Sequence, residues 1–260
     1  MKKVRKKFLE KDRPVPADDT TATPAPLSVD FDAQVTGLAA LGDPLRRSLY
    51  RYVIVQSSAV NRGQVADGVG VARHVAKFHL DKLVDDGLLA VEYARPPGRR
   101  GPGAGRPAKL YSRSSRELAI SLPQRNYELA ARMLAKAVTA AERDGVAVGE
   151  TLGQAARDTG HALGQQARQY AGVRPKPSTL LAAAMTALGE SGYEPRIDGA
   201  SVTLVNCPFH GLAQEYTDLV CGMNLDLMAG LVEGLADPTL EARLEPTPGL
   251  CCIRLRRPDA

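Results

Sequence analysis

The sequence lacks any apolar run that is long enough to cross a bilayer. Its basic start, MKKVRKKFLEK, is followed by acidic residues, Pro and Thr, and not by the apolar core of a secretion signal. We therefore expect a soluble, cytoplasmic protein with no membrane partner. The 260 residues, 44% of them hydrophobic, are enough for two domains of ordinary size.

Motifs of common enzyme sites are also missing. The sequence contains no Gly-rich phosphate loop, no nucleophile elbow and no HExxH pair, and its carboxylates form no convincing acid/base pair. A catalytic zinc would need a carboxylate or histidine near an open position, and only His210, Glu215 and Asp218 lie near cysteines in the sequence. We predict that the chain is not an enzyme.

Residues 1–30 join a KKVRKK tip to a tract rich in Pro, Thr and Asp. Such a tract buries too little apolar surface to offset the entropy of ordering it. We expect a disordered basic arm, whose tip either touches phosphate or is a solvated tail without a role.

Residues 31–114 carry three helical patterns followed by a hairpin pattern. Asp43 can cap a helix that opens with Pro44 and turns Leu45, Leu49, Tyr52 and Val53 inward. A short helix follows in NRGQVADGVG, and a longer one in VARHVAKFHLDKLVDDGLL stops at Gly87.

The longer helix has two distinct faces. Ala72, Ala76, Leu80 and Leu83 fall within an arc of about 80° and form a packing face. The opposite side carries polar, basic and aromatic residues that suit base edges in a major groove, or else form an ordinary solvated face. These residues are Arg73, His74, Lys77, Phe78 and Asp81.

The segment after this helix has no carboxylate between Glu92 and Glu117. It reads as a strand, a long Gly/Pro loop and a return strand, and its unpaired cations suit phosphates or a narrow minor groove. The alternative is a merely solvated linker. The cations are Arg95, Arg99, Arg100, Arg106 and Lys109.

These residues carry a family resemblance. LGDPLRRSLYRYV resembles the opening helix of ArsR-like winged helix-turn-helix transcriptional regulators, HLDKLVDDGLL resembles the end of their recognition helix, and GRPAKLY is similar to the second wing strand of related repressors. The resemblance implies a winged helix over residues 31–114 that binds a double-stranded DNA operator. The metal sites of ArsR-type regulators usually lie in the winged helix itself, and this one has no cysteine.

Residues 115–146 contain a long helix with Tyr127, Ala130, Leu134, Ala137, Val138 and Ala141 along one stripe. Its small residues would let two helices approach closely. We expect a linker and dimerisation helix, because a homodimer holds two half-sites about 34 Å apart. The alternative is packing within the same chain.

Residues 147–260 read as helices at 149–171 and 178–190, two strands, a cysteine-bearing segment, a helix ending at Leu235 and two short strands. This order predicts a small α+β domain, so the fold class of the whole chain is α+β.

The chain has four cysteines, and all of them lie in this last part: Cys207, Cys221, Cys251 and Cys252. If residues 210–235 formed one helix, Cys221 would stand about 15 Å from Cys207 along the axis. A shared site therefore requires a turn before Thr217 and a new helix capped by Thr217 or Asp218, with Leu219, Met223, Leu227 and Leu231 facing inward. In a final strand Cys251 and Cys252 would point to opposite faces, so one of the two would join.

Three thiolates with a weaker partner, either His210 or the second strand cysteine, suit zinc or a [4Fe-4S] cluster. This half of the chain also resembles the sensor domain of SufR-type iron-sulfur repressors, by the spacing of Cys207, Cys221 and one of the Cys251/Cys252 pair. That family has a further cysteine between the second and the last, which this chain lacks. Inert core thiols without metal are the alternative.

Together these patterns predict a homodimeric DNA-binding transcriptional regulator, a repressor, whose operator binding is controlled by an iron-sulfur cluster or redox state at the cysteines. One alternative is a winged-helix regulator that senses an organic ligand and keeps its cysteines as structural residues. Others are a zinc-dependent enzyme domain fused to a winged helix, and a purely architectural DNA-binding protein.

Overall fold

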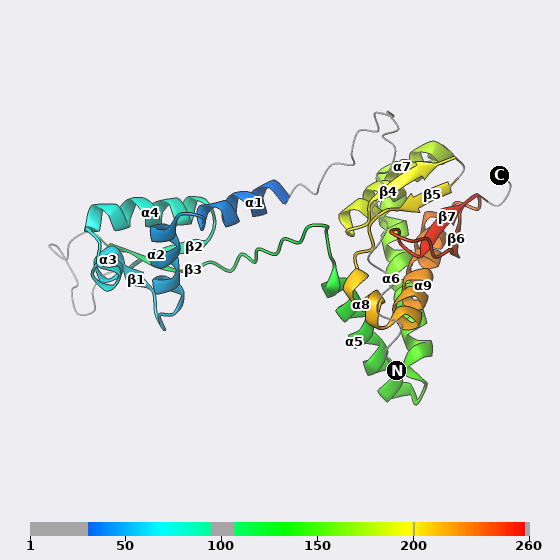
Figure 1. Ribbon diagram of the computed structural model, residues 1–260, viewed down its shortest axis with the longest axis horizontal. Helices are drawn as coiled ribbons and strands as arrows, with labels where there is room; N and C mark the ends of the chain where they lie inside the picture. Colours follow the sequence, from blue (N-terminus) through cyan, green and yellow to red (C-terminus); the bar gives the residue numbers. More distant parts are fainter. Residues whose placement is uncertain (1–30, 95–106, 200, 258–260) are drawn as a thin grey trace, which may run out of the picture.

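The computed structural model describes residues 31–94, 107–199 and 201–257. Figure 1 shows two bodies joined by an extended segment. We call them the N-terminal body (residues 31–113), the linker (residues 114–126) and the C-terminal body (residues 127–257). The expected arm over residues 1–30 lies outside the described residues.

The described N-terminal body contains four helices and one antiparallel sheet in the order β1-β3-β2. Its elements are α1 (Phe31–Ala40), α2 (Pro44–Ile54), β1 (Val60–Asn61), α3 (Arg62–Val69), α4 (Arg73–Asp85), β2 (Leu89–Ala94) and β3 (Ala108–Arg113).

Local signals in the sequence explain where these helices begin and end. The Asp43 side chain accepts a 2.8 Å hydrogen bond from the Arg46 backbone N–H, so the predicted cap with Pro44 in the first turn is confirmed. Asn61 and Gln64 form a capping box at the start of α3. Gly70 ends α3 at φ 76°, and Gly87 follows α4 at φ 74°, backbone values that favour glycine.

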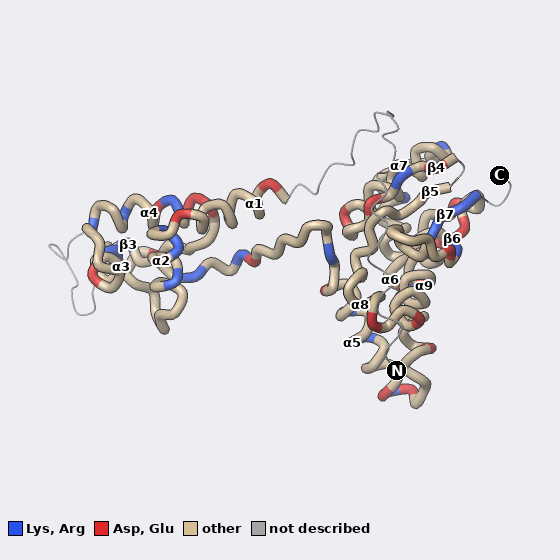
Figure 2. Tube along the Cα trace, viewed as in Figure 1, with Lys and Arg blue, Asp and Glu red and all other residues tan. Residues whose placement is uncertain are grey.

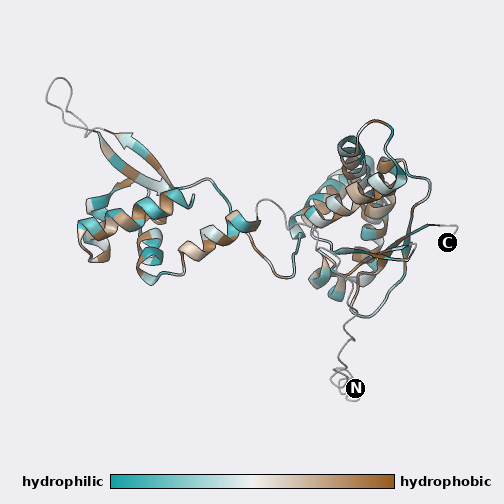
Figure 3. Cartoon of the chain, turned by 90° about the horizontal axis from the view of Figure 1, so that it is seen from above, coloured by the Kyte–Doolittle hydropathy of each residue, from teal (hydrophilic) through white to brown (hydrophobic). Residues whose placement is uncertain are grey.

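The buried face of α4 packs on the core of the N-terminal body. Ala76, Leu80 and Leu83 are fully buried against residues of α2, α3 and the sheet, as the helical periodicity predicts. Ala72 was expected on the same face but is exposed, because it is the N-cap residue and precedes the helix. Figure 3 shows the β2–β3 hairpin projecting beside these helices.

The described C-terminal body is a layered α+β unit with the antiparallel sheet order β4-β5-β7-β6. Its elements are α5 (Tyr127–Asp144), α6 (Val148–Ala171), α7 (Pro177–Glu190), β4 (Pro195–Asp198), β5 (Ser201–Leu204), α8 (His210–Glu215), α9 (Thr217–Leu235), β6 (Glu241–Leu244) and β7 (Ile253–Arg256). All of these elements except β4 contribute residues to one hydrophobic core.

Helices α6 and α9 approach each other so closely that glycines of one helix contact the backbone of the other. A Cβ atom at Gly160 would overlap the carbonyl oxygen of Leu227, and one at Gly230 would overlap the carbonyl oxygen of Arg157. Gly164 and Gly234 make the same kind of close approach one turn further on. The two helix backbones are therefore in direct contact, which fixes the C-terminal half of α9 against α6.

The small-residue face of α5 packs inside the same chain. Ala130, Ala137 and Ala141 are buried together with Met133, and α5 lies against α6. Tyr127 and Val138 from the expected stripe remain exposed. The described structure therefore gives the small residues a partner within the chain, and it contains no second copy that would test the dimer.

The linker is anchored at both ends. The Leu118 side chain packs on the core of the N-terminal body, and the Ala119 backbone N–H donates to the Gln34 side chain at 3.1 Å. At the other end, the Asn126 backbone N–H donates to the Pro208 carbonyl oxygen at 3.1 Å. Among the described helices, none has both the length and the apolar character needed to cross a membrane.

Candidate functional site

The outward face of α4 presents the residues that the sequence assigned to DNA. Arg73, His74, Lys77 and Phe78 are all exposed, and the Phe78 ring is 67% exposed although it is a large apolar group. Phe78 also packs edge-on against the ring of His79, with ring centroids 5.2 Å apart. Figure 2 marks the Lys and Arg positions along the trace of α4 in blue. This face offers donors and a flat apolar group to solvent, while the other face is buried.

Asp81 lies beside this face and binds groups from two elements. It accepts 3.0 Å and 2.5 Å hydrogen bonds from Lys77 and Lys109, and a third, of 3.1 Å, from the Tyr111 hydroxyl. Burial alone would raise the pKa of Asp81, but the hydrogen bonds from Lys109 and Lys77 outweigh it and lower the pKa. Asp81 therefore joins α4 to β3.

The hairpin cations are only partly within the described structure. Lys109 lies in β3, with its ammonium group 5.2 Å from the centre of the Tyr111 ring. The four arginines of the loop lie outside the described residues: Arg95, Arg99, Arg100 and Arg106.

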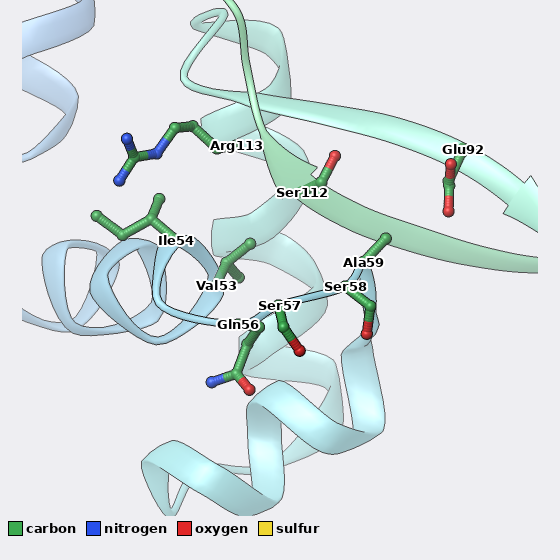
Figure 4. Close-up of a pocket in the computed structure, with 9 residues that line it drawn as sticks. All are labelled: Val53, Ile54, Gln56, Ser57, Ser58, Ala59, Glu92, Ser112 and Arg113. Carbon is green, nitrogen blue, oxygen red and sulfur yellow. The ribbon is translucent and has the colours of Figure 1, made fainter.

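A hollow in the N-terminal body lies between the loop after α2 and the hairpin (Figure 4). Gln56, Ser57 and Ser58 face Glu92 of β2 and Ser112 of β3 across it. This lining is mainly polar, whereas an organic-effector pocket is mainly apolar with a few placed polar groups.

The cysteine segment folds as a shared site requires. Residues after Cys207 make the short helix α8, the chain turns at Tyr216, and α9 begins at Thr217 as predicted. The expected cap is wrong, because Tyr216 is the N-cap residue and makes no side-chain cap. Leu219 is also 47% exposed, because the buried face of α9 runs through Val220, Met223 and Leu227.

All four cysteines are free thiols, and they lie in neighbouring pairs. Hydrogen bonding to the Cys251 side chain, followed by burial, raises the pKa of Cys207 well above its usual range. The side chain of Cys251 hydrogen-bonds to both Cys207 and Cys252. The bond with Cys207 lowers the pKa of Cys251, whereas the bond with Cys252 and burial raise it, and the net result is a pKa raised to about 11. Burial raises the pKa of Cys221, and its side-chain hydrogen bond with Cys252 acts in the opposite direction.

Cys251 and Cys252 do not lie in the last strand. The strand β7 begins only at Ile253, so the strict alternation of side chains does not apply to this pair. The strand placement behind the expectation that at most one of the two joins a metal site is therefore wrong. Cys251 neighbours Cys207 and Cys252 neighbours Cys221, and which of the two would bind a metal stays a prediction. His210 is exposed on α8, where its ring lies 3.0 Å from the Gln214 amide nitrogen.

Buried polar side chains surround the thiols. The Asn224 amide nitrogen donates to Cys251 Sγ at 3.3 Å, and the Tyr193 hydroxyl donates to Asn224 Oδ1 at 2.5 Å. Burial, together with the nearby thiols, raises the pKa of Tyr193 well above its usual value. Asn224 and Tyr193 are 1% and 2% exposed, so this network holds Cys251 inside the core.

The linker binds directly to the backbone of the cysteine segment. The Arg125 guanidinium donates to Asn206 Oδ1 and, at 3.1 Å, to the Cys207 carbonyl oxygen. The Asn206 amide in turn donates to the carbonyl oxygens of Gln124 and Gly192, both at 2.7 Å. We call this set of contacts the linker clasp.

Across the described ranges, no group of three or more His, Cys, Asp and Glu side chains is arranged so that it could hold a metal ion. The thiols form a series of pairs and do not point to one centre. Their chemistry nevertheless fits a thiophilic ion or cluster, because Cys207, Cys251 and Cys252 lie in one core and the fourth free thiol, Cys221, hydrogen-bonds to Cys252.

Sequence reasoning missed several residues of these sites. Arg125 and Tyr111 were not assigned, and neither were the buried polar groups Asn206, Asn224 and Tyr193. Their roles depend on pairings between residues far apart in the chain, such as Arg125 with Asn206, 81 positions away. The only signal in the sequence was that Asn206 directly precedes the first cysteine.

Helices α2, α3 and α4 pack against one another in the N-terminal body, an arrangement that fits a helix-turn-helix domain. A family model described as a helix-turn-helix domain matches residues 41–92, which run from the residue after α1 into β2. This domain points to a DNA-binding regulator more than to an enzyme. The match covers none of the C-terminal body.

No match to a curated protein was found, and no solved structure matches the chain.

Proposed function

We propose that the chain is a homodimeric transcriptional repressor in which α4 enters the major groove of operator DNA and the β2–β3 hairpin serves as the wing. The observation that carries this proposal is the two-sided helix α4, with Ala76, Leu80 and Leu83 buried and four candidate DNA-contacting residues exposed. A helix in a major groove needs one packed face and one face of donors.

The hairpin supports the same role. In a winged helix the hairpin beside the recognition helix contacts phosphates or the minor groove. Lys109 lies on β3 beside α4, and its ion pair with Asp81 links the two elements. The sequence places four further arginines between β2 and β3.

We further propose that the cysteines control DNA binding by holding an iron-sulfur cluster, with zinc as the alternative cofactor. Cys207, Cys221 and one or both of Cys251 and Cys252 would supply the thiolates, after their side chains turn towards a common centre. A bound cluster or ion supplies positive charge that stabilises deprotonated thiols, and a cluster adds sensitivity to oxidants.

The linker clasp supports coupling between the two bodies. Arg125 contacts the carbonyl oxygen of Cys207 itself, so a change in the Cys207 backbone alters the anchor of the linker. A shift of the anchor changes how the two helix-turn-helix domains of a dimer are held apart, and a coupling free energy of about 1–3 kcal/mol changes affinity about 5- to 150-fold.

DNA binding is tested with duplexes selected from a random library and followed by fluorescence anisotropy. Lys77→Ala and Arg73→Ala should each weaken binding about ten-fold and leave the fold intact. Lys136→Ala is the matched control, because it removes an exposed cation from α5. Equal affinities for all four proteins would contradict the assignment of α4.

Cysteine control is tested on protein prepared anaerobically, by visible absorption, iron and zinc content, and DNA binding before and after exposure to air. Cys207→Ser and Cys221→Ser should each lose the bound metal. Met223→Leu is the control, because it removes the thioether sulfur of a residue close to Cys221 in the sequence and nearly keeps the side-chain volume. A colourless, metal-free protein that still binds DNA would favour the organic-ligand alternative.

A further inference from the structure

The carboxylate of Asp81 occupies an unexpected place for a DNA-binding surface. It lies one helical turn after Lys77 on the outward side of α4 and is bonded to both Lys77 and Lys109. These two lysines come from different elements, 32 positions apart in the sequence. The carboxylate therefore withholds two cations at the point where the helix meets the hairpin.

The position of this carboxylate is fixed. The Tyr111 hydroxyl donates a third hydrogen bond to it from a side chain that is only 1% exposed. The Asp81 side chain is itself 29% exposed, whereas the paired Lys77 side chain is 56% exposed. If the Asp81 side chain rotated into solvent, the buried Tyr111 hydroxyl would lose this hydrogen-bond partner, which is costly.

This arrangement bears on how DNA is selected. Binding to arbitrary duplex DNA comes almost entirely from lysine and arginine contacts with phosphates. A fixed carboxylate competes with phosphate for the same ammonium groups and repels phosphates that approach it. Both effects weaken binding to any duplex that offers only phosphates.

We propose that Asp81 is a selectivity residue: by holding Lys77 and Lys109 it suppresses binding to non-operator DNA, and the lysines are released only by a duplex that also engages the rest of the α4 face. The inference rests on the proposed DNA-binding function and deepens it. It separates residues that attract DNA from one that limits which DNA is bound.

The test uses the full chain and a random-sequence duplex, with affinity measured from 50 to 200 mM salt. Asp81→Asn removes the charge, nearly keeps the shape and still accepts from Tyr111. Asp85→Asn is the matched control, because Asp85 is an exposed carboxylate at the end of the same helix. Asp81→Glu keeps the charge at this position.

Asp81→Asn should bind the random duplex about three-fold more tightly at 50 mM salt. The slope of log K against log salt should become steeper by about one for each freed lysine that reaches a phosphate, and so by about one to two. Asp85→Asn and Asp81→Glu should keep slopes close to that of the parent. The preference for operator over random duplex should fall in Asp81→Asn alone.

A second variant keeps the proposal testable if Asp81→Asn unfolds, which thermal melting would reveal. Lys109→Gln should leave the slope on random duplex unchanged, because Asp81 already withholds that ammonium group from phosphate. A slope that falls by about one in Lys109→Gln, or equal slopes in Asp81→Asn and Asp85→Asn, would overturn the inference alone. A parent that binds no duplex at any salt would overturn the proposed function and the inference with it.

Discussion

The two bodies of this chain differ in how many charged and polar side chains they bury. The core of the N-terminal body consists of aliphatic side chains and Tyr111. Tyrosines aside, Asp86 is its one buried charged or polar residue among those described, and the body turns Lys77 and Phe78 outward. The C-terminal body, Tyr193 aside, buries five such residues among those described. They are Ser191, Thr203, Asn206, Asn224 and Asp237.

This difference suits different tasks. A surface that reads a large polymer must be exposed and needs only a firm support behind it, which the core of the N-terminal body supplies. Buried polar groups are costly unless they are satisfied, and a network such as Tyr193, Asn224 and Cys251 fixes its members in place. The contrast predicts that changes in the two bodies have separable effects.

The largest effect is expected from Gly160→Ala, which places a methyl group against the carbonyl oxygen of Leu227. The backbones of α6 and α9 must separate, so the C-terminal body should lose about 3 kcal/mol or more of unfolding free energy. The N-terminal body should keep its own transition in calorimetry. Gly149→Ala, also in α6, meets open space and should be neutral or stabilising. One shared transition that shifts as a whole would break the comparison.

Arg125→Ala should have the next largest effect, because it removes the linker clasp. Loss of hydrogen bonds from a charged group to Asn206 and Cys207 should cost the C-terminal body about 1.5–3 kcal/mol. Proteolysis in the linker should become faster, and the difference in DNA affinity between metal-loaded and metal-free protein should narrow. Arg132→Ala, which removes only an exposed pair with Glu128, should leave all three measurements unchanged.

Phe78→Ala should separate function from stability in the N-terminal body. The ring is 67% exposed, so the unfolding free energy should change by less than about 0.5 kcal/mol. Operator affinity should fall about three- to ten-fold through the loss of an apolar contact with bases. Val55→Ala, at an exposed position after α2, is the control for both measurements. Undiminished affinity in Phe78→Ala would remove the ring from the DNA-binding face.

The smallest expected effect is a loss of unfolding free energy of the N-terminal body at acid pH. The pKa of Asp81 is lowered in the folded state below its usual 3.8, so its stabilising pairs are present above that value and are lost as the pH falls below it. Melting between pH 5 and pH 3 should show this as a loss within about 1 kcal/mol. Asp81→Asn should reduce the dependence, and an identical acid profile in the two proteins would show that the pairs contribute no stability.

Much of the fold follows from local sequence signals. Asp43 with Pro44, Asn61 with Gln64, and the glycines at 70 and 87 bound the helices of the N-terminal body, and the sequence shows each of them directly. The start of α9 at Thr217 was predicted from a distance requirement between Cys207 and Cys221. The backbone contact of α6 with α9 was not predicted, because it depends on which glycines meet across two helices.

The candidate sites were predictable only in part. Helical periodicity separates Lys77 and Phe78 from the buried face of α4, so the exposed residues could be named in advance. Periodicity could not show that Asp81 holds two of the cations, since one partner lies in a distant strand. Strand alternation failed for Cys251 and Cys252, because the backbone before β7 is irregular.

The anchors of the linker also limit how far the two bodies can separate. Ala119 is bonded to the N-terminal body and Gln124 to the C-terminal body, so the chain between the two anchors is residues 120–123. An extended chain covers at most about 3.5 Å per residue, or about 14 Å over this stretch. While both anchors hold, this short span limits how far the two bodies can separate. Under the proposed cysteine control, loss of the linker clasp would lengthen the span, and the distance between the two bodies would then report the state of the cysteines.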